Sequence, residues 1–272
     1  MPLDSERSRV SHLLRRAGFG STEAELDDYT ALGYDATLDR LLNYTQVDDS
    51  ATNELVASLA TDPGNFEHAR QAWLMRMLHT RRPLQEKMVL FWHTHFATGS
   101  SKVRRAALMV QQIQLFREHA LGNFEMLLRA VTRDPAMLIW LDNDGNRVGQ
   151  PNENYAREVM ELFTVGIGNY NDRDVKEAAR AFTGYGTDRA GQFAFDATQH
   201  DYGPKTFLGV TKDWDADDVL AALARHPATA RFLSAKLFRF FVHDHPDSSA
   251  INRLAATYLN SGFDMRAVVA TS

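Results

Sequence analysis

Signals that start and stop helices recur along this chain and constrain its fold more than any other feature of the sequence. Capping side chains precede stretches in which apolar residues recur at three- and four-residue spacing, and the first two stretches, 5–17 and 22–32, end at Gly18 and Gly33. The same pattern predicts helices over residues 34–43, 49–61, 66–80, 84–96, 101–121, 123–133, 135–141, 152–165, 172–182, 213–224, 226–242 and 247–260.

Only two short segments favour strands. Residues 192–196 and 206–208 are flanked by glycines and a proline, so they predict one small hairpin or an irregular flap. No internal repeat is visible, which argues against a solenoid. We therefore predict a mainly α fold: an irregular multi-helix orthogonal bundle with one small β-hairpin near residues 192–208.

The length and composition are those of a soluble globular protein. A chain of 272 residues can bury one large helical core or two closely packed lobes, and we expect a single α-helical domain over residues 1–272. Hydrophobic residues make up 44% of the chain and charged residues 24%. The net charge of -5 argues against a sequence-independent grip on nucleic acid, which needs a basic surface. We expect no nucleic acid partner, and the oligomeric state stays open.

The residue types that are missing also restrict the chemistry and the location. The chain has no cysteine, which excludes disulfides, zinc-thiolate sites and thiol nucleophiles. The first residues, MPLDSERSRVSHLL, lack the apolar core of a signal peptide, and no apolar run reaches the ~18 residues of a membrane span. We therefore expect neither a signal peptide nor a transmembrane segment, and the compartment stays open.

The densest polar stretch lies between residues 142 and 154. Asp142, Asp144 and Asn146 stand at positions 1, 3 and 5 of the ligand spacing of a twelve-residue calcium loop, and Glu153 stands at position 12. Arg147 occupies the place where such a loop needs glycine, and short runs of Asp, Asn and Gly also form ordinary turns. The stretch therefore predicts either a divalent cation site or a turn.

The helix predicted over residues 152–165 follows directly. Asn152 is a good N-cap, and Asn154, Glu158 and Glu161 lie on its polar side, where we expect them to bind a ligand. Glu158 lies at the edge of the apolar arc, where partial burial would raise its pKa and suit it, or Glu161, to act as a general base or metal ligand. The alternative is a solvated or ion-paired glutamate.

Two histidines stand in the helix predicted over residues 84–96. Residues two apart on a helix point about 200° from each other, so His93 and His95 cannot share one ion there. His95 falls on the apolar face, which is typical of a hydrogen-bonded core residue. If the helix ended early and the chain became extended, both rings would converge as ligand-binding groups.

A third polar group lies in the glycine-bearing loop after residue 199. His200 and Asp201 would form a proton-transfer pair, while Lys205 or Arg180 would stabilise developing negative charge. The alternative is that Asp201 caps a turn. The chain contains neither a GxSxG elbow nor an HExxH helix, which disfavours the familiar serine and zinc hydrolases.

Five segments spread through the chain resemble a known family. They are residues 12–20 (HLLRRAGFG), 90–98 (LFWHTHFAT), 151–166 (PNENYAREVMELFTVG), 174–184 (DVKEAARAFTG) and 200–209 (HDYGPKTFLG). Together they resemble the bacterial family known as domain of unknown function 1800, whose activity is not established. The resemblance implies that the family's domain continues beyond Ser272, and the last apolar pattern indeed stops without a C-cap. We therefore expect a C-terminal truncation.

The leading hypothesis for function is an enzyme that acts on a polar small substrate, carbohydrate-like or phosphorylated, with a divalent cation as candidate cofactor. It requires that the segments around residues 93–95, 152–161 and 200–205 converge in one pocket. The first alternative is a noncatalytic helical scaffold or binding module, in which the same residues cap helices and fix loops. The second is a divalent-ion site of structural role at residues 142–153.

Overall fold

Helices make up most of the protein, as predicted from its sequence. The computed structural model describes residues 4–59 and 62–272. Its first half contains α1 (Glu6–Ala17), α2 (Glu23–Leu32), α3 (Tyr34–Leu42), η1 (Tyr44–Gln46), α4 (Ser50–Leu59), α5 (Phe66–His79), α6 (Pro83–His95), α7 (Ser100–Val103), α8 (Ala106–Glu118), α9 (Phe124–Thr132) and α10 (Pro135–Trp140). The second half contains η2 (Asn143–Gly145), α11 (Glu153–Glu158), the π-helix η3 (Val159–Phe163), α12 (Asp172–Ala181), η4 (Ala197–Gln199), α13 (Ala216–Arg225), α14 (Pro227–Phe241), α15 (Ser248–Asn260) and α16 (Met265–Thr271).

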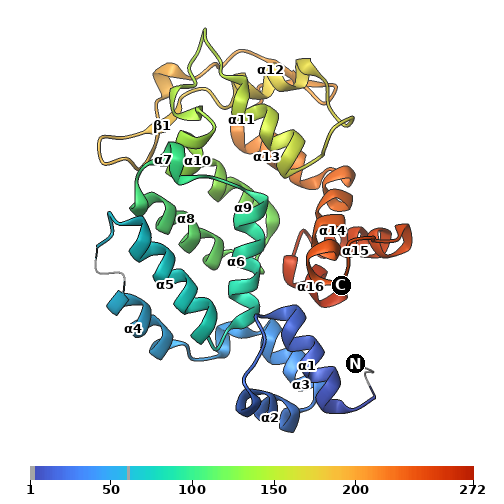
Figure 1. Ribbon diagram of the computed structural model, residues 1–272. Coiled ribbons are helices and arrows are strands. Elements are labelled where there is room, and N and C mark those ends of the chain that lie inside the picture. The colour runs from blue at the N-terminus through green and yellow to red at the C-terminus, as the bar shows by residue number, and fades with distance from the viewer. Residues whose placement is uncertain (1–3, 60–61) are drawn as a thin grey trace.

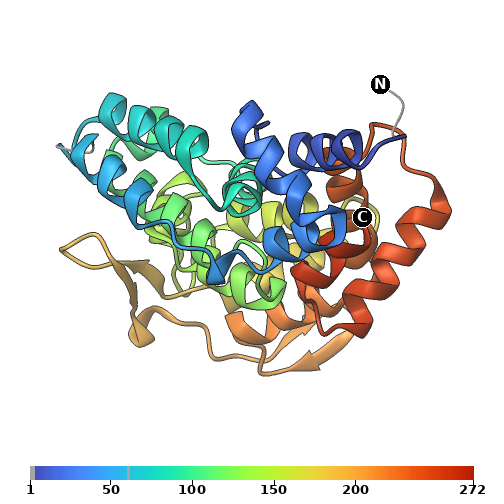
Figure 2. The same cartoon turned by 90° about the horizontal axis from the view of Figure 1, so that it is seen from below.

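The chain runs up one side of the molecule and returns down the other. Helices α1 to α3 form one end, α10 to α12 form the opposite end, and α14 to α16 come back beside α1 (Figure 1). Two hydrogen bonds close this circuit: Arg16 donates to the Phe241 oxygen, and Arg266 donates to Asn43 Oδ1 at 2.8 Å. Figure 2 shows the strand-bearing segment, in tan and orange, on the side opposite the blue and cyan helices.

One cluster of buried side chains extends from Val10 in α1 to Val268 in α16. Aromatic rings fill its centre, where Trp92 stacks on Phe96, and the indole Nε1 of Trp92 donates to the Ala120 oxygen at 2.9 Å. Burying a large apolar side chain contributes about 1.5–3 kcal/mol. The packing around Trp92 therefore fixes α6, the helix that carries His93 and His95.

Local capping explains where the helices begin. Ser5 and Thr22 form capping boxes at α1 and α2, and Asn171 does the same at α12 through Asp174. The predicted starts agree with the observed ones within a few residues. Residues 60 and 61, the predicted end of the helix over 49–61, and residues 1–3 lie outside the described ranges.

The long helix predicted over residues 101–121 is broken. Helix α7 ends at Val103, and the next residue, Arg104, has a left-handed conformation (φ 54°). Arg105 is extended and precedes α8. The break allows Val103 and Leu108 to pack together against Ala136 in a small separate cluster. Tertiary packing thus overrides a continuous helical pattern.

Two small hairpins replace the single one that we predicted. Strand β1 (Tyr185–Thr187) pairs with β2 (Phe193–Phe195), and β3 (Lys205–Phe207) pairs with β4 (Val210–Lys212), both antiparallel. Leu208 and Gly209 connect β3 to β4 with positive φ angles of 47° and 79°, the geometry of a tight two-residue turn. Each predicted strand therefore pairs with a neighbour close in sequence.

Within residues 4–59 and 62–272, no helix combines the length and the apolar character that crossing a bilayer would need.

Candidate functional site

The three histidines singled out in the sequence line three different cavities. His93 lines one of about 330 Å³ beside Trp73, and His95 lines one of about 310 Å³ beside Lys236. His200 lines a third, of about 360 Å³. The three histidines therefore do not share one of these cavities, whereas the leading hypothesis from the sequence requires a common pocket.

We call residues 142–154 the acidic loop. Several of its polar side chains form ion pairs or hydrogen bonds with other groups of the protein. Asp142 pairs with Lys102 at 2.6 Å. Asn146 is 2% exposed; its amide donates to the Ala179 oxygen at 2.9 Å, and its Oδ1 accepts from the Asn152 N–H at 2.9 Å. The buried amide thus ties the loop to the end of α12.

The neighbouring asparagines act on main-chain groups. Asn152 caps α11 by accepting from the Asn154 N–H at 2.9 Å, and it donates to the Asp142 oxygen at 3.0 Å. Asn154 donates to the Leu141 oxygen at 3.1 Å. Both side chains are oriented by the loop itself.

Asp144 and Glu153 complete the spacing that predicted a calcium shell. Asp144 is exposed, and Glu153 pairs with Arg157 at 3.4 Å. In the described part of the chain, no three His, Asp or Glu side chains gather in a group that could hold a metal ion. The cation shell of Asp142, Asp144, Asn146 and Glu153 stays a prediction.

The charges of the His200 loop satisfy one another. Arg180 forms a two-pronged pair with Asp201, at 2.7 and 3.1 Å, and also pairs with Glu177 at 2.8 Å. The hydrogen bonds from Arg180 lower the pKa of Asp201. Lys205 is 2% exposed, and its ammonium donates to the oxygens of Asp201 and Gly203 at 2.6 and 3.0 Å. This network holds the shape of the loop.

His200 itself has a fixed orientation. Its Nδ1 lies 2.8 Å from the Thr183 oxygen, which can only accept, so Nδ1 carries the proton and Nε2 carries the lone pair. The ring lies edge-on to Tyr202, at 4.6 Å between centroids, and to Phe195, at 5.5 Å. The histidine therefore contacts two aromatic rings, and the nitrogen that can accept a proton in its neutral form is Nε2.

Gly184 allows the loop to approach the end of α12. Its φ is +83°, and a Cβ there would lie 2.6 Å from the Asp196 oxygen and 3.4 Å from the His200 Cβ. Any other residue would combine left-handed strain with a backbone clash. Glycine at this position therefore helps to place His200.

The acidic loop and the His200 loop lie side by side. The Val148 N–H donates to the Gln199 oxygen at 2.7 Å, and the Gly184 N–H donates to the Asn146 oxygen at 2.9 Å. These bonds bring together two of the polar segments that the sequence separates.

We call the cavity around His200 the His200 pocket. Its walls are Arg133, Ala181, Tyr185, Phe193, Phe195, His200, Tyr202, Asp215, Ala216 and Asp217. Tyr202 and Phe195 are well exposed, at 65% and 48%. Arg133 pairs with Asp217 at 2.7 Å, which neutralises the only arginine in the walls. The pocket is thus aromatic, with two carboxylates and one paired cation.

A different pair of segments meets at His95. The ring is 4% exposed, and its Nε2 lies 3.0 Å from the Phe163 oxygen in the π-helix η3. Its Nδ1 lies 3.2 Å from Lys236 Nζ, which also donates to the Leu162 oxygen at 3.1 Å. Burial, and then the charge of Lys236, hold the pKa of His95 well below its usual value. His95 is therefore a neutral, hydrogen-bonded residue of the core that also faces a cavity.

Glu158 and Glu161 lie on the other side of the same segment. Burial raises the pKa of Glu158, as predicted, and the neighbouring Glu161 adds to this shift. Tyr170 donates to Glu161 at 2.9 Å, and burial raises the pKa of Tyr170 to about 12. Neither glutamate lines the cavities named here, so a role in proton transfer stays a prediction.

The two rings of α6 do not converge, because the helix continues through His95. His93 stacks on Trp73 with 5.2 Å between centroids and 13° between planes. His93 and His95 therefore line different cavities, because residues two apart on a helix point in nearly opposite directions.

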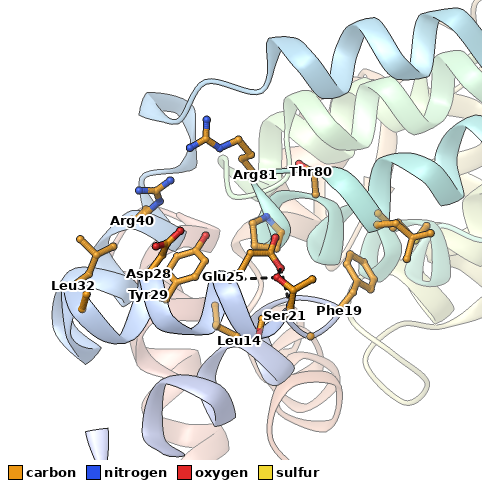
Figure 3. Close-up of a pocket in the computed structure, with 16 residues that line it drawn as sticks. Leu14, Phe19, Ser21, Glu25, Asp28, Tyr29, Leu32, Arg40, Thr80 and Arg81 are labelled. Atoms are coloured by element: carbon orange, nitrogen blue, oxygen red, sulfur yellow. Dashed lines mark hydrogen bonds between the residues drawn. The ribbon is translucent and has the colours of Figure 1, made fainter. Parts of the chain in front are cut away.

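Sequence reasoning missed the cavity that is larger than these three, about 560 Å³. Figure 3 shows Arg40 and Arg81 at one end of it, near Asp28 and Tyr29, and Phe19 at the other end. Its walls come from α1, α2, α3, α5 and α6, each of which contributes only a few ordinary side chains. No local pattern marks such a site.

These features define a mainly helical protein whose cavities lie where distant helices and loops meet. Residues 12–272 match the family described as Protein of unknown function (DUF1800), and the chain belongs to that family. The resemblance carried by the five sequence segments is thereby confirmed. No curated protein and no solved structure matches the chain.

Proposed function

We propose that the protein is an enzyme that acts on a neutral, carbohydrate-like ligand in the His200 pocket, with His200 as the base. The observation that carries the proposal is the contact of His200 with two exposed aromatic rings, Phe195 and Tyr202, together with its bond to the Thr183 carbonyl oxygen, which leaves the lone pair of the neutral ring on Nε2. A volume of about 360 Å³ is near the lower end for small-molecule sites and suits one or two sugar rings.

The aromatic walls favour a ring-shaped ligand. Tyr202 and Phe195 offer flat apolar faces, and the Tyr202 hydroxyl adds a polar end. Sugars present apolar C–H faces with hydroxyl groups around the rim, so they match this combination.

The charges favour a neutral ligand over a phosphorylated one. Among the described residues the walls hold two carboxylates, Asp215 and Asp217, and one arginine, Arg133, which is paired with Asp217. Asp217 also pairs with Arg129 at 2.7 Å, so Asp215 is the wall carboxylate without an arginine partner in the described part of the chain. Carboxylates accept hydrogen bonds from hydroxyl groups but repel phosphate. The sequence-based hypothesis offered a carbohydrate-like or a phosphorylated substrate, and these charges favour the carbohydrate-like one.

The basic nitrogen of His200 suits removal of a proton from a ligand hydroxyl or from a water molecule. The Thr183 oxygen would stabilise the imidazolium that forms, because it accepts from Nδ1. Asp201 contributes indirectly, since its pair with Arg180 shapes the loop that holds His200.

A noncatalytic binding module is the second candidate. It is favoured by one observation: Asp201, Lys205 and Arg180, three of the predicted chemical groups, are bonded to one another or to their own loop. In that case the pocket would hold a sugar without transforming it.

Calorimetric titration with a panel of soluble oligosaccharides tests the proposal. Tyr202→Ala should weaken binding about tenfold, since an aromatic contact of this kind contributes on the order of 1–1.5 kcal/mol. Phe19→Ala, which removes a partly exposed aromatic ring from another cavity, is the matched control and should leave affinity unchanged.

Turnover separates the two candidates. His200→Asn should retain binding and lose product formation if the protein is an enzyme. Binding by the unaltered protein without any product would favour the binding module. If no sugar binds, or if the Tyr202 and Phe19 variants bind alike, the pocket is not a carbohydrate site.

A further inference from the structure

Lys236 stands in an unusual environment for a lysine. It lies on α14, and its ammonium reaches across to the end of α6 and to η3, where it donates to His95 Nδ1 and to the Leu162 oxygen. The ammonium also lies 4.5 Å from the centre of the Phe232 ring. Across residues 4–59 and 62–272, no Asp or Glu forms an ion pair with it.

The partners of Lys236 suit a free amine as well as an ammonium ion. Phe163 accepts from His95 Nε2, so the imidazole is held with its Nδ1 lone pair directed at Lys236. An amine can donate one hydrogen to His95 and one to Leu162 and keep its own lone pair for reaction. His95 is thus a positioning residue.

Burial favours that uncharged form. It lowers the pKa of Lys236 to about 8. At pH 7 about one molecule in ten would then carry the free amine, against roughly one in 2,500 for an exposed lysine. The uncharged amine is the nucleophilic form.

The amine faces an open cavity, which we call the Lys236 pocket. It has a volume of about 310 Å³ and is lined by Phe91, Thr94, His95, Lys236, Arg239 and Phe240. Arg239 is exposed and stands three residues from Lys236, so both lie on the same side of α14. The pocket therefore combines apolar walls, an amine inside and a cation at its rim.

We propose that Lys236 is the nucleophile of a second site, which condenses with a small anionic aldehyde or ketone to form an imine. The amine nitrogen bonds to the carbonyl carbon, and the carbonyl oxygen takes one proton from the nitrogen to become a hydroxyl group. The carbon–oxygen bond then breaks as the carbon–nitrogen double bond forms, and the hydroxyl group leaves as water with the second proton from the nitrogen. The proton released by the ammonium passes to solvent, and no oxidant or reductant takes part. Arg239 binds the carboxylate or phosphate of the ligand.

Reductive trapping tests this proposal in the whole chain. Glyoxylate, an anionic aldehyde, is added with cyanoborohydride, which reduces an imine to a stable secondary amine. The chain has six lysines, so peptide mass mapping can assign every adduct. Lys236 should be modified at least about tenfold faster than the other five, in keeping with its larger uncharged fraction.

Two lysine variants serve as a matched pair. Lys236→Arg keeps the positive charge but cannot form the imine, and it should remove the dominant adduct. Lys87→Arg should retain it, although Lys87 is also partly buried and lies 5.3 Å from the Phe240 ring. Thermal unfolding of both variants shows that they are folded.

A third variant tests the role of the rim. Arg239→Gln should slow trapping of glyoxylate several-fold and leave trapping of neutral propanal unchanged. Equal modification of all lysines, or a dominant adduct that persists in Lys236→Arg, would overturn the assignment of Lys236. Failure of sugar binding at the His200 pocket has no bearing on this result, because the two pockets share no wall residue.

Discussion

Lys205 and Lys236 are both drawn away from solvent, yet their surroundings differ. Lys205 donates to the oxygens of Asp201 and Gly203, which are four and two residues away in its own loop. Lys236 instead meets His95 and Leu162, which are 141 and 74 residues away in sequence. The first lysine completes a loop, whereas the second lies where three helical segments meet.

The difference between local and long-range partners helps to separate structural polar residues from candidate reactive ones. A loop dense in polar residues can satisfy its own donors and acceptors, and its side chains then stabilise the local shape. Lys236 instead bonds to groups of α6 and η3, which are distant in sequence, so tertiary packing decides its contacts. The bonds of Lys205 within its own loop therefore indicate a structural role, whereas the long-range contacts of Lys236 favour it as the candidate nucleophile.

The largest expected effect is a contrast in stability between two lysine variants. Lys205→Met should lower the free energy of unfolding by about 2–4 kcal/mol, because it leaves two loop carbonyls without their donor. Lys236→Met should change it by less than about 1 kcal/mol, because it removes a buried charge that has no counter-ion. Urea denaturation measures both values. Equal losses would mean that the two lysines have the same structural role.

Asp134 is a buried charged residue that can be compared with Lys205 and Lys236. Its side chain is 2% exposed, caps α10 and accepts from Gln112 at 2.7 Å, while its Oδ1 has no hydrogen-bond partner among the described residues. Burial raises its pKa to about 6. The folded protein therefore binds more protons than the unfolded chain between about pH 4 and 6, and stability should fall as pH rises through that window.

Asp134→Asn should remove this pH dependence while keeping a good cap. The variant should be more stable than the original protein by about 1–3 kcal/mol at pH 7.5, and the advantage should vanish near pH 4. Urea denaturation of both proteins at pH 7.5 and at pH 4 measures this difference in the free energy of unfolding. An advantage that is the same at both would show that the charge of Asp134 is not the cause.

The smallest expected effect concerns the acidic loop. Because Asp142 is paired with Lys102 and Asn146 is bonded within the protein, millimolar calcium should shift the thermal midpoint by less than about 1 °C relative to a chelator. A larger rise that Asp144→Asn abolishes would establish the cation site, and would show that this polar loop does not satisfy all its own charges.

Much of the fold was predictable because helices begin with local chemistry. Caps such as Thr22 and Asn171 act within three residues, so a sequence window contains the whole interaction. The break at Arg104 was not predictable, because it depends on packing of Val103 against Ala136 in a distant helix. The pairing of β1 with β2 was missed for a related reason, since three-residue strands carry almost no pattern of their own.

The candidate sites show the same limit. His200 was predicted as a candidate because His, Asp and Lys occur close together in a glycine-bearing loop. The raised pKa of Glu158 was predicted from its place at the edge of the apolar arc. Lys236 was missed, although a lone lysine in the apolar run LSAKLFRFFV is a signal that sequence reading can use. Its partners, His95 and Leu162, are fixed only by tertiary packing.

The wide turn of η3 has a consequence for how this protein tolerates changes in length. A π-helix holds one residue more per turn than an α-helix of the same span, and here that turn ends where the Leu162 and Phe163 oxygens accept from Lys236 and His95. Deleting one residue between 159 and 163 would remove the extra residue, and with it the wide turn that sets the direction of the Leu162 and Phe163 oxygens. Both acceptors would then turn away from their donors, so a one-residue deletion would do more harm there than most substitutions.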